Sequence, residues 1–172
     1  DCFDIEVDAD NPDDFVDTVA RIASGFGGIN LEDIAAPHCF DIEKRLIEKL
    51  DIPVFHDDQH GTAVVVLAAL INALKIVDKK PGDLRIVILG VGAAGLACAR
   101  IMLDFGVKQI IGLDRSGIIY NGRKENMNEE KEWFAKHTNP EKIKGDILVA
   151  SKGADVFLGL SGPGLFPVEA LQ

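Results

Sequence analysis

A glycine-rich turn constrains the fold of this chain more than any other feature. Its glycines match the pattern G-x-G-x-x-G directly after an apolar, β-branched stretch at residues 84–89 and directly before a small-residue helical stretch at residues 92–105. In this pattern one glycine permits a tight turn, a second lets a pyrophosphate approach the backbone, and a third lets the helix pack closely on the strand. The sequence therefore predicts a dinucleotide-binding turn formed by Gly90, Val91, Gly92, Ala93, Ala94 and Gly95.

An acidic residue follows the next predicted strand, at residues 109–113. Asp114 stands about 20 residues beyond the last glycine of the turn, where an acid accepts hydrogen bonds from the adenosine ribose of NAD. Its charge would repel the 2′-phosphate of NADP, whereas the adjacent Arg115 would accommodate it, so the choice between NAD and NADP stays open. The alternative is that the glycines only turn a strand into a helix and that Asp114 is a solvated loop residue.

Strands and helices alternate along the rest of the chain. A third strand is expected at residues 154–160 and a helix at residues 129–136, which predicts an α/β fold with a Rossmann-type doubly wound parallel sheet. Before it we expect part of a smaller α/β catalytic domain, with helices at 12–24, 40–50 and 61–77 and extended segments at 29–33 and 51–55. A polar, turn-rich linker at 78–83 predicts two domains, residues 1–77 and residues 84–172, the second incomplete at its C-terminal end.

The charge and the cysteines exclude several classes of partner. The chain has 18 Lys and Arg against 28 Asp and Glu, a formal net charge of −10, which makes nucleic acid and anionic membranes poor partners. The longest uninterrupted apolar run, residues 63–71, is too short to span a bilayer. The three cysteines have no disulfide-like or metal-like spacing, which favours the cytoplasm. The chain begins with Asp1 and ends inside a helix-like segment, so we expect it to be a piece of a longer protein.

Two pairs of acids end the extended segments of the first domain. Glu32 and Asp33 follow one segment, and Asp57 and Asp58 follow the other. Carboxylates that converge at the ends of strands suit hard divalent ions such as Mg²⁺ or Mn²⁺. The alternative is that these acids are solvated turn and capping residues. A zinc site of the H-E-x-x-H type is disfavoured, because Asp57 replaces the glutamate and no uninterrupted helix is expected there.

Two longer blocks carry a family resemblance. Residues 26–37, F-G-G-I-N-L-E-D-I-A-A-P, and residues 52–63, I-P-V-F-H-D-D-Q-H-G-T-A, together with the glycine turn, resemble malic enzymes of the bacterial type over essentially the whole chain. The resemblance implies metal-dependent oxidative decarboxylation of L-malate to pyruvate and CO₂ with reduction of NAD or NADP. It assigns Glu32, Asp33 and Asp58 as ligands of Mg²⁺ or Mn²⁺ and Asp57 as a neighbouring active-site acid. It places Ser161, in the loop S-G-P-G, near the nicotinamide side of the cofactor.

The departures from the family are equally specific. Malic enzymes use a tyrosine as general acid and a lysine as general base upstream of the first acidic block, but the only tyrosine here is Tyr120 and the first lysine is Lys44. Neither can be assigned, and we expect both to lie outside this chain. The alternatives are a malolactic enzyme, which converts malate to lactate, and a non-catalytic dinucleotide-binding module. We expect a homodimer or a higher homo-oligomer in the cytoplasm.

Overall fold

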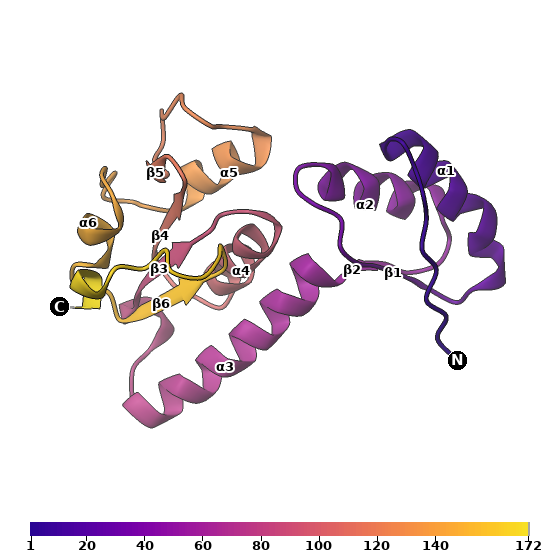
Figure 1. Ribbon diagram of the computed structural model, residues 1–172. Coiled ribbons are helices and arrows are strands. Elements are labelled where there is room, and N and C mark those ends of the chain that lie inside the picture. Colours follow the sequence, from indigo (N-terminus) through magenta and orange to yellow (C-terminus); the bar gives the residue numbers. More distant parts are fainter. Residues whose placement is uncertain (172) are drawn as a thin grey trace. The chain divides into compact units, whose positions relative to one another are not determined.

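The computed structural model describes residues 1–171 and divides into two compact units, Asp1–Asp58 and Gln59–Gln172 (Figure 1). The sequence analysis placed the division later, in the linker at residues 78–83. The difference is the apolar helix α3 (Thr62–Val77), which packs on α4 (Ala93–Asp104) and therefore groups with the second unit. The linker itself forms a short 3₁₀ turn, Pro81–Asp83 (η3).

The first unit pairs two helices with a small parallel sheet. In chain order it contains α1 (Pro12–Ile22), a 3₁₀ turn (Ala23–Gly25, η1), β1 (Ile29–Leu31), α2 (His38–Lys49) and β2 (Val54–His56). α1 begins where the sequence predicts, because the Asn11 side chain accepts a hydrogen bond of 3.0 Å from the backbone N–H of Asp14. A π-helical turn, Asp57–Gly61 (η2), follows β2 directly.

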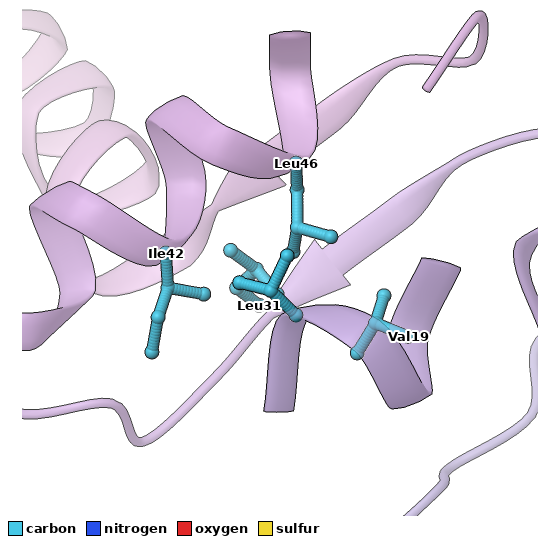
Figure 2. Close-up of a cluster of buried hydrophobic side chains, with 5 residues drawn as sticks. Val19, Leu31, Ile42 and Leu46 are labelled. Carbon is cyan, nitrogen blue, oxygen red and sulfur yellow. The ribbon is translucent and has the colours of Figure 1, made fainter. Parts of the chain in front are cut away.

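The core of the first unit is one cluster of aliphatic side chains (Figure 2). It contains Val16 and Val19 from α1, Leu31 from β1, and Ile42 and Leu46 from α2. The helical members are three or four residues apart, so each helix presents one apolar stripe to the sheet. Leu46 is fully buried, and shortening such a side chain to alanine costs about 2–5 kcal/mol.

The second unit is built on a four-stranded sheet in the order β5-β4-β3-β6. β3 (Arg85–Leu89) pairs in parallel with both β4 (Gln109–Asp114) and β6 (Val156–Gly159), and β5 (Gly117–Ile118) is antiparallel to β4. The remaining elements are α5 (Glu129–His137), α6 (Ile147–Ser151) and a 3₁₀ turn, Val168–Leu171 (η4). The three predicted parallel strands are confirmed, with β3 central.

Helices cover both faces of this sheet, which is the doubly wound arrangement that the sequence predicts. On one face Val87 and Ile111 pack against Ala150 of α6. On the other face Phe134 of α5 lies so close to Gly112 that an added Cβ would come within 2.3 Å of its ring. Figure 1 shows α4 and α6 on opposite sides of the strands.

Helix α3 corrects the expectation about membrane-spanning segments. The helical stretch Asp57–Val77 has 21 residues and a mean hydropathy of 1.8 in its most apolar window, so it is long and apolar enough to cross a membrane by length and composition. Counting only the uninterrupted apolar run missed it. A core helix of a globular domain meets the same test, and α3 buries Ala63, Leu70 and Leu74. Only 17% of that window is buried, and Ile76 is 85% exposed.

Candidate functional site

The two acidic pairs lie at one edge of the small sheet. β1 and β2 are parallel, and Leu31 is the register partner of His56. Glu32 and Asp33 therefore leave β1 beside the point where Asp57 and Asp58 leave β2, because parallel strands end at the same edge. The convergence that the sequence predicts for these two segments is confirmed for their backbones. We call these four residues the acidic edge.

The backbone departs from regular structure at both halves of the acidic edge. Asp33 has a φ of 55°, in the left-handed region that residues other than glycine rarely adopt. Asp57 and Asp58 open the π-helical turn, a rare conformation that is often found at functional sites. Strained or rare backbone at two adjoining strand ends points to a functional site.

One residue on each strand contacts the acid two positions later. The Asn30 side-chain amide donates a hydrogen bond of 2.8 Å to Oε1 of Glu32. His56 is fully buried, and its Nε2 lies 3.5 Å from Oδ2 of Asp58, whose side chain is 46% exposed. His56 belongs to a strand and His60 to the π-helical turn, so the two rings do not stand on one regular helix as an H-E-x-x-H zinc site requires.

The acidic edge fits a hard divalent cation by its chemistry. All its donors are carboxylates, and an exposed carboxylate such as that of Asp58 is free of the large desolvation cost of a buried one. Within residues 1–171, no three or more His, Cys, Asp and Glu side chains are gathered as a metal ion requires. Metal ligation by Glu32, Asp33 and Asp58, and a role for Asp57, therefore stay predictions.

In the second unit the three glycines of the turn have three different environments. Gly90 has a φ of 108°, and a Cβ there would come within 2.5 Å of the Ser161 hydroxyl. At Gly95 a Cβ would lie 2.2 Å from the carbonyl oxygen of Gly90. At Gly92, by contrast, no atom of the described chain lies within 4 Å of an added Cβ. The first and third glycines are thus required by packing, whereas the second leaves open space where a pyrophosphate would approach.

The turn is anchored to the strands on either side of it. The backbone N–H groups of Gly90 and Val91 both donate to the carbonyl of Leu113, over 2.9 and 3.2 Å. Ala93 and Ala94 then open α4, whose first N–H groups suit an anion. Beside the turn, residues 159–166 together with Leu89 and Phe157 line a cavity of about 410 Å³. Ser161 lies in this lining, so the predicted phosphate turn and the predicted nicotinamide-side loop adjoin each other.

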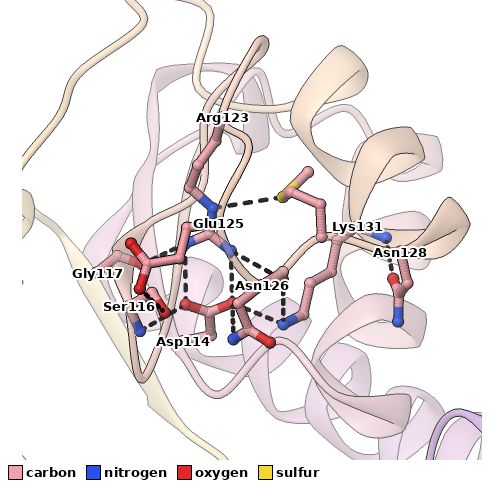
Figure 3. A network of polar contacts seen from close by, with 9 residues as sticks. Asp114, Ser116, Gly117, Arg123, Glu125, Asn126, Asn128 and Lys131 are labelled. Carbon is pink, nitrogen blue, oxygen red and sulfur yellow. Dashed lines mark hydrogen bonds and ion pairs between the residues drawn. The ribbon is translucent and has the colours of Figure 1, made fainter.

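Asp114 is the centre of a polar network rather than a solvated acid (Figure 3). Its side chain is only 9% exposed. Arg123 donates to both carboxylate oxygens, over 2.9 and 2.5 Å, and Lys131 donates to Oδ2 over 2.6 Å. The Asn126 amide and the Ser116 backbone N–H add bonds of 3.0 and 2.9 Å. We call Asp114, Ser116, Arg123, Asn126 and Lys131 the Asp114 network.

The charge state of Asp114 follows from this network. Burial alone would raise the pKa of Asp114, but the hydrogen bonds from Arg123 and Lys131 outweigh burial and lower the pKa to about 2. A carboxylate has about four acceptor positions, and the network supplies five donors. A ribose hydroxyl would therefore have to displace a protein donor, and ribose binding by Asp114 stays a prediction. Arg115, the other residue considered for nucleotide choice, is exposed.

Sequence reasoning missed the partners of Asp114. Arg123 and Asn126 lie in a loop, and Lys131 lies in the first turn of α5, where the Asn128 side chain accepts a 2.9 Å bond from its backbone N–H. The available signal was weak, namely two cations within a polar stretch that follows an acid at a strand end. Periodicity carries no information about such a loop.

Comparison with known proteins identifies the family. Residues 4–47 match the family "Malic enzyme, N-terminal domain", and residues 59–172 match "Malic enzyme, NAD binding domain". This chain belongs to the malic enzyme family. The NAD-dependent malic enzyme of Geobacillus stearothermophilus is 54% identical over 100% of the chain and 36% of its own length. The NADP-dependent malic enzyme of Halomonas elongata is 52% identical over 98% of the chain and 39% of its own length.

Solved structures of the malic enzyme family agree with the fold. The NAD-dependent malic enzyme of Thermotoga maritima superposes with a TM-score of 0.93 at 44% identity, over 98% of this chain and 45% of that one. The malic enzyme of Pyrococcus horikoshii gives a TM-score of 0.85 at 46% identity, over 94% of this chain and 39% of that one. The chain thus spans less than half the length of these relatives.

Proposed function

We propose that this chain is part of an enzyme that oxidatively decarboxylates L-malate to pyruvate and CO₂ with reduction of NAD or NADP. The observation that carries the proposal is the parallel pairing of β1 with β2, which brings two acidic pairs to one edge of a sheet in a chain that matches both malic enzyme domains. The glycine turn of the second unit supports it, because its open position at Gly92 suits a dinucleotide pyrophosphate.

At the acidic edge, Glu32, Asp33 and Asp58 would hold Mg²⁺ or Mn²⁺, and Asp57 would stand beside them. When bound, the metal supplies Lewis acidity toward the malate oxygens and the negative charge that develops as CO₂ leaves. The three carboxylates also let an acidic protein hold an anionic substrate, since the cation they bind reverses the local charge. The predicted general acid tyrosine and general base lysine are not among the residues assigned here.

In the second unit the chain's task is to bind and orient the dinucleotide. The Gly90–Gly95 turn and the first turn of α4 offer backbone N–H groups to the pyrophosphate, and the loop containing Ser161 lines the adjoining cavity. Hydride transfer requires the donor carbon to be held against the nicotinamide ring, which is a matter of position rather than of protein chemistry. Relatives are named as NAD-dependent and as NADP-dependent, so we propose no preference.

The test uses the longest polypeptide that the gene encodes, with L-malate, Mn²⁺ and each nicotinamide in turn. Reduced cofactor and the three-carbon product are measured in the same reaction. Pyruvate with stoichiometric reduced cofactor is the expected result, and it settles the choice of nucleotide. Absence of product from a polypeptide that contains the expected tyrosine and lysine would contradict the proposal and leave a dinucleotide-binding module.

A malolactic activity is the second candidate. It is favoured by one relative, the bifunctional malic/malolactic enzyme of Bacillus subtilis, which is 45% identical over 100% of this chain. The same experiment separates the two, because lactate without net cofactor reduction indicates the malolactic reaction. We further propose a cytoplasmic homo-oligomer that binds neither nucleic acid nor membranes; the net charge of −10 supports the last two points.

A further inference from the structure

His56 occupies an unusual place beneath the acidic edge. It is the last residue of β2, and it is fully buried while its neighbour Phe55 is 41% exposed. Strand alternation therefore turns the imidazole inward, toward the layer formed by α2. Two residues later the chain has returned to the surface at Asp58, whose carboxylate lies 3.5 Å from Nε2 of the buried ring.

The groups around this ring leave the imidazole as the donor toward Asp58. Cys39 of α2 is buried in the same unit, and burial, with smaller contributions from Glu43 and Asp58, raises the pKa of its thiol to about 11. The thiol is therefore neutral at physiological pH and does not compete as a charged ligand. An imidazole N–H, in contrast, donates to a carboxylate in either its neutral or its protonated form.

The other strand repeats the arrangement. Asn30 of β1 donates to Glu32 two positions later, as His56 of β2 contacts Asp58 two positions later. Because Leu31 is the register partner of His56, these contacts are made on adjoining strands at the same edge. Each strand thus supplies one residue that restrains one predicted ligand, but Asn30 is exposed and His56 is buried, so the histidine is the more rigid support.

We propose that His56 is a positioning residue that orients the Asp58 carboxylate for metal binding. The inference rests on the proposed metal site. A buried ring surrounded by packed side chains has a single orientation, so it fixes an exposed carboxylate that would otherwise sample several rotamers. Partners that orient ligating groups in this way typically change metal affinity by about 10–100-fold when they are removed.

The experiment measures Mn²⁺ binding directly, by the electron paramagnetic resonance signal of free Mn²⁺, in the longest polypeptide that the gene encodes and without substrate. His56→Leu removes the donor but keeps an apolar side chain in the buried position, and we expect Mn²⁺ affinity to fall about 10–100-fold. His56→Gln keeps an N–H near the position of Nε2, and we expect affinity within about threefold of the unsubstituted protein. Circular dichroism verifies that each variant is folded, and His56→Met replaces the leucine variant if that one is not.

Two further comparisons make the result specific. In an Asp58→Ala background, His56→Leu should cause no additional loss, because the carboxylate that it orients is absent. Asn30→Ala, the matched change on β1, should weaken Mn²⁺ binding less than His56→Leu does. Unchanged affinity in His56→Leu, or equal losses in the leucine and glutamine variants, would overturn the inference. Absence of Mn²⁺ binding by the unsubstituted protein would instead overturn the proposed metal site, and this inference with it.

Discussion

Asp58 and Asp114 hold comparable positions in the two units and have opposite environments. Each stands at the carboxyl end of a parallel strand, where ligands bind in open α/β sheets. The side chain of Asp58 is 46% exposed and contacts His56, whereas that of Asp114 is 9% exposed and accepts five hydrogen bonds from the protein. The first carboxylate is available to a ligand, and the second is committed to the fold.

The difference comes from the segment that follows each strand. After β2 the chain enters the π-helical turn and then α3, which carries only apolar and uncharged side chains through its first three turns. After β4 it enters a polar loop that returns Arg123 and Asn126 to Asp114. A strand-end acid is therefore a candidate ligand only when the following segment leaves it without strong donors.

The largest expected effect tests this comparison through stability. Asp114→Ala removes the anion between two buried or nearly buried cations, and breaking such a pair typically costs about 3–5 kcal/mol. Asp58→Ala changes an exposed residue and should cost less than about 1 kcal/mol. Urea unfolding measures both, with circular dichroism for each variant and fluorescence of Trp133, the only tryptophan, for the second unit. Equal losses in the two variants would contradict the comparison.

Ligand binding should reverse the order of the two regions. Gly92→Val places a side chain in the open space of the glycine turn, and we expect dinucleotide affinity to fall at least about 100-fold, which is about 2.8 kcal/mol, with little change in stability. Isothermal titration with NAD and NADP measures the loss. Gly95→Ala is the matched control, because its Cβ would clash with the Gly90 carbonyl and destabilise the turn itself. Retained affinity in Gly92→Val would show that the turn is only structural.

The pH dependence of stability should distinguish the same two carboxylates. The pKa of Asp114 is lowered to about 2, so its contribution is fully present above its unfolded pKa and is lost as the pH falls from about 4 toward 2. A shift of this size corresponds to at most about 2.6 kcal/mol. Urea midpoints between pH 5 and pH 2 should show this loss, and Asp114→Asn should flatten the curve. An unchanged curve in that variant would show that other carboxylates dominate acid unfolding.

The smallest effect concerns the cysteines, which compare the cores of the two units. Burial raises the pKa of Cys39 in the first unit and of Cys98 in the second to about 11, whereas Cys2 is exposed. A thiol reagent at neutral pH should therefore label Cys2 rapidly and the other two only on unfolding. Peptide mapping after brief labelling identifies the sites. Rapid reaction at Cys39 but not at Cys98 would show that the first unit opens more readily.

The sequence predicts the parts of this structure that depend on periodicity or on steric necessity. The parallel strands β3, β4 and β6, the helix starts at Pro12 and Glu129, and the distinct roles of the three glycines follow from apolar spacing, capping and the absence of side chains. Convergence of the acidic pairs was also predictable, because it requires only that two strands be parallel and adjacent.

The parts that were not predictable depend on a few residues without a repeating pattern. β5 has two residues and α6 has five, both too short for a periodic signal to develop. The left-handed conformation of Asp33 and the π-helical turn have no signature in composition. The Asp114 network joins residues 9, 12 and 17 positions beyond the aspartate, a spacing that only the folded loop explains.

The pairing of β1 with β2 also separates the dimensions of the acidic edge from the length of chain between its halves. Adjacent strands lie about 4.8 Å apart whatever connects them, so the distance between the two acidic pairs is set by the sheet. Residues 34–53, including α2, are free to lengthen or shorten without altering that distance. A single residue inserted within β2, however, would turn His56 outward and shift both acids by one position.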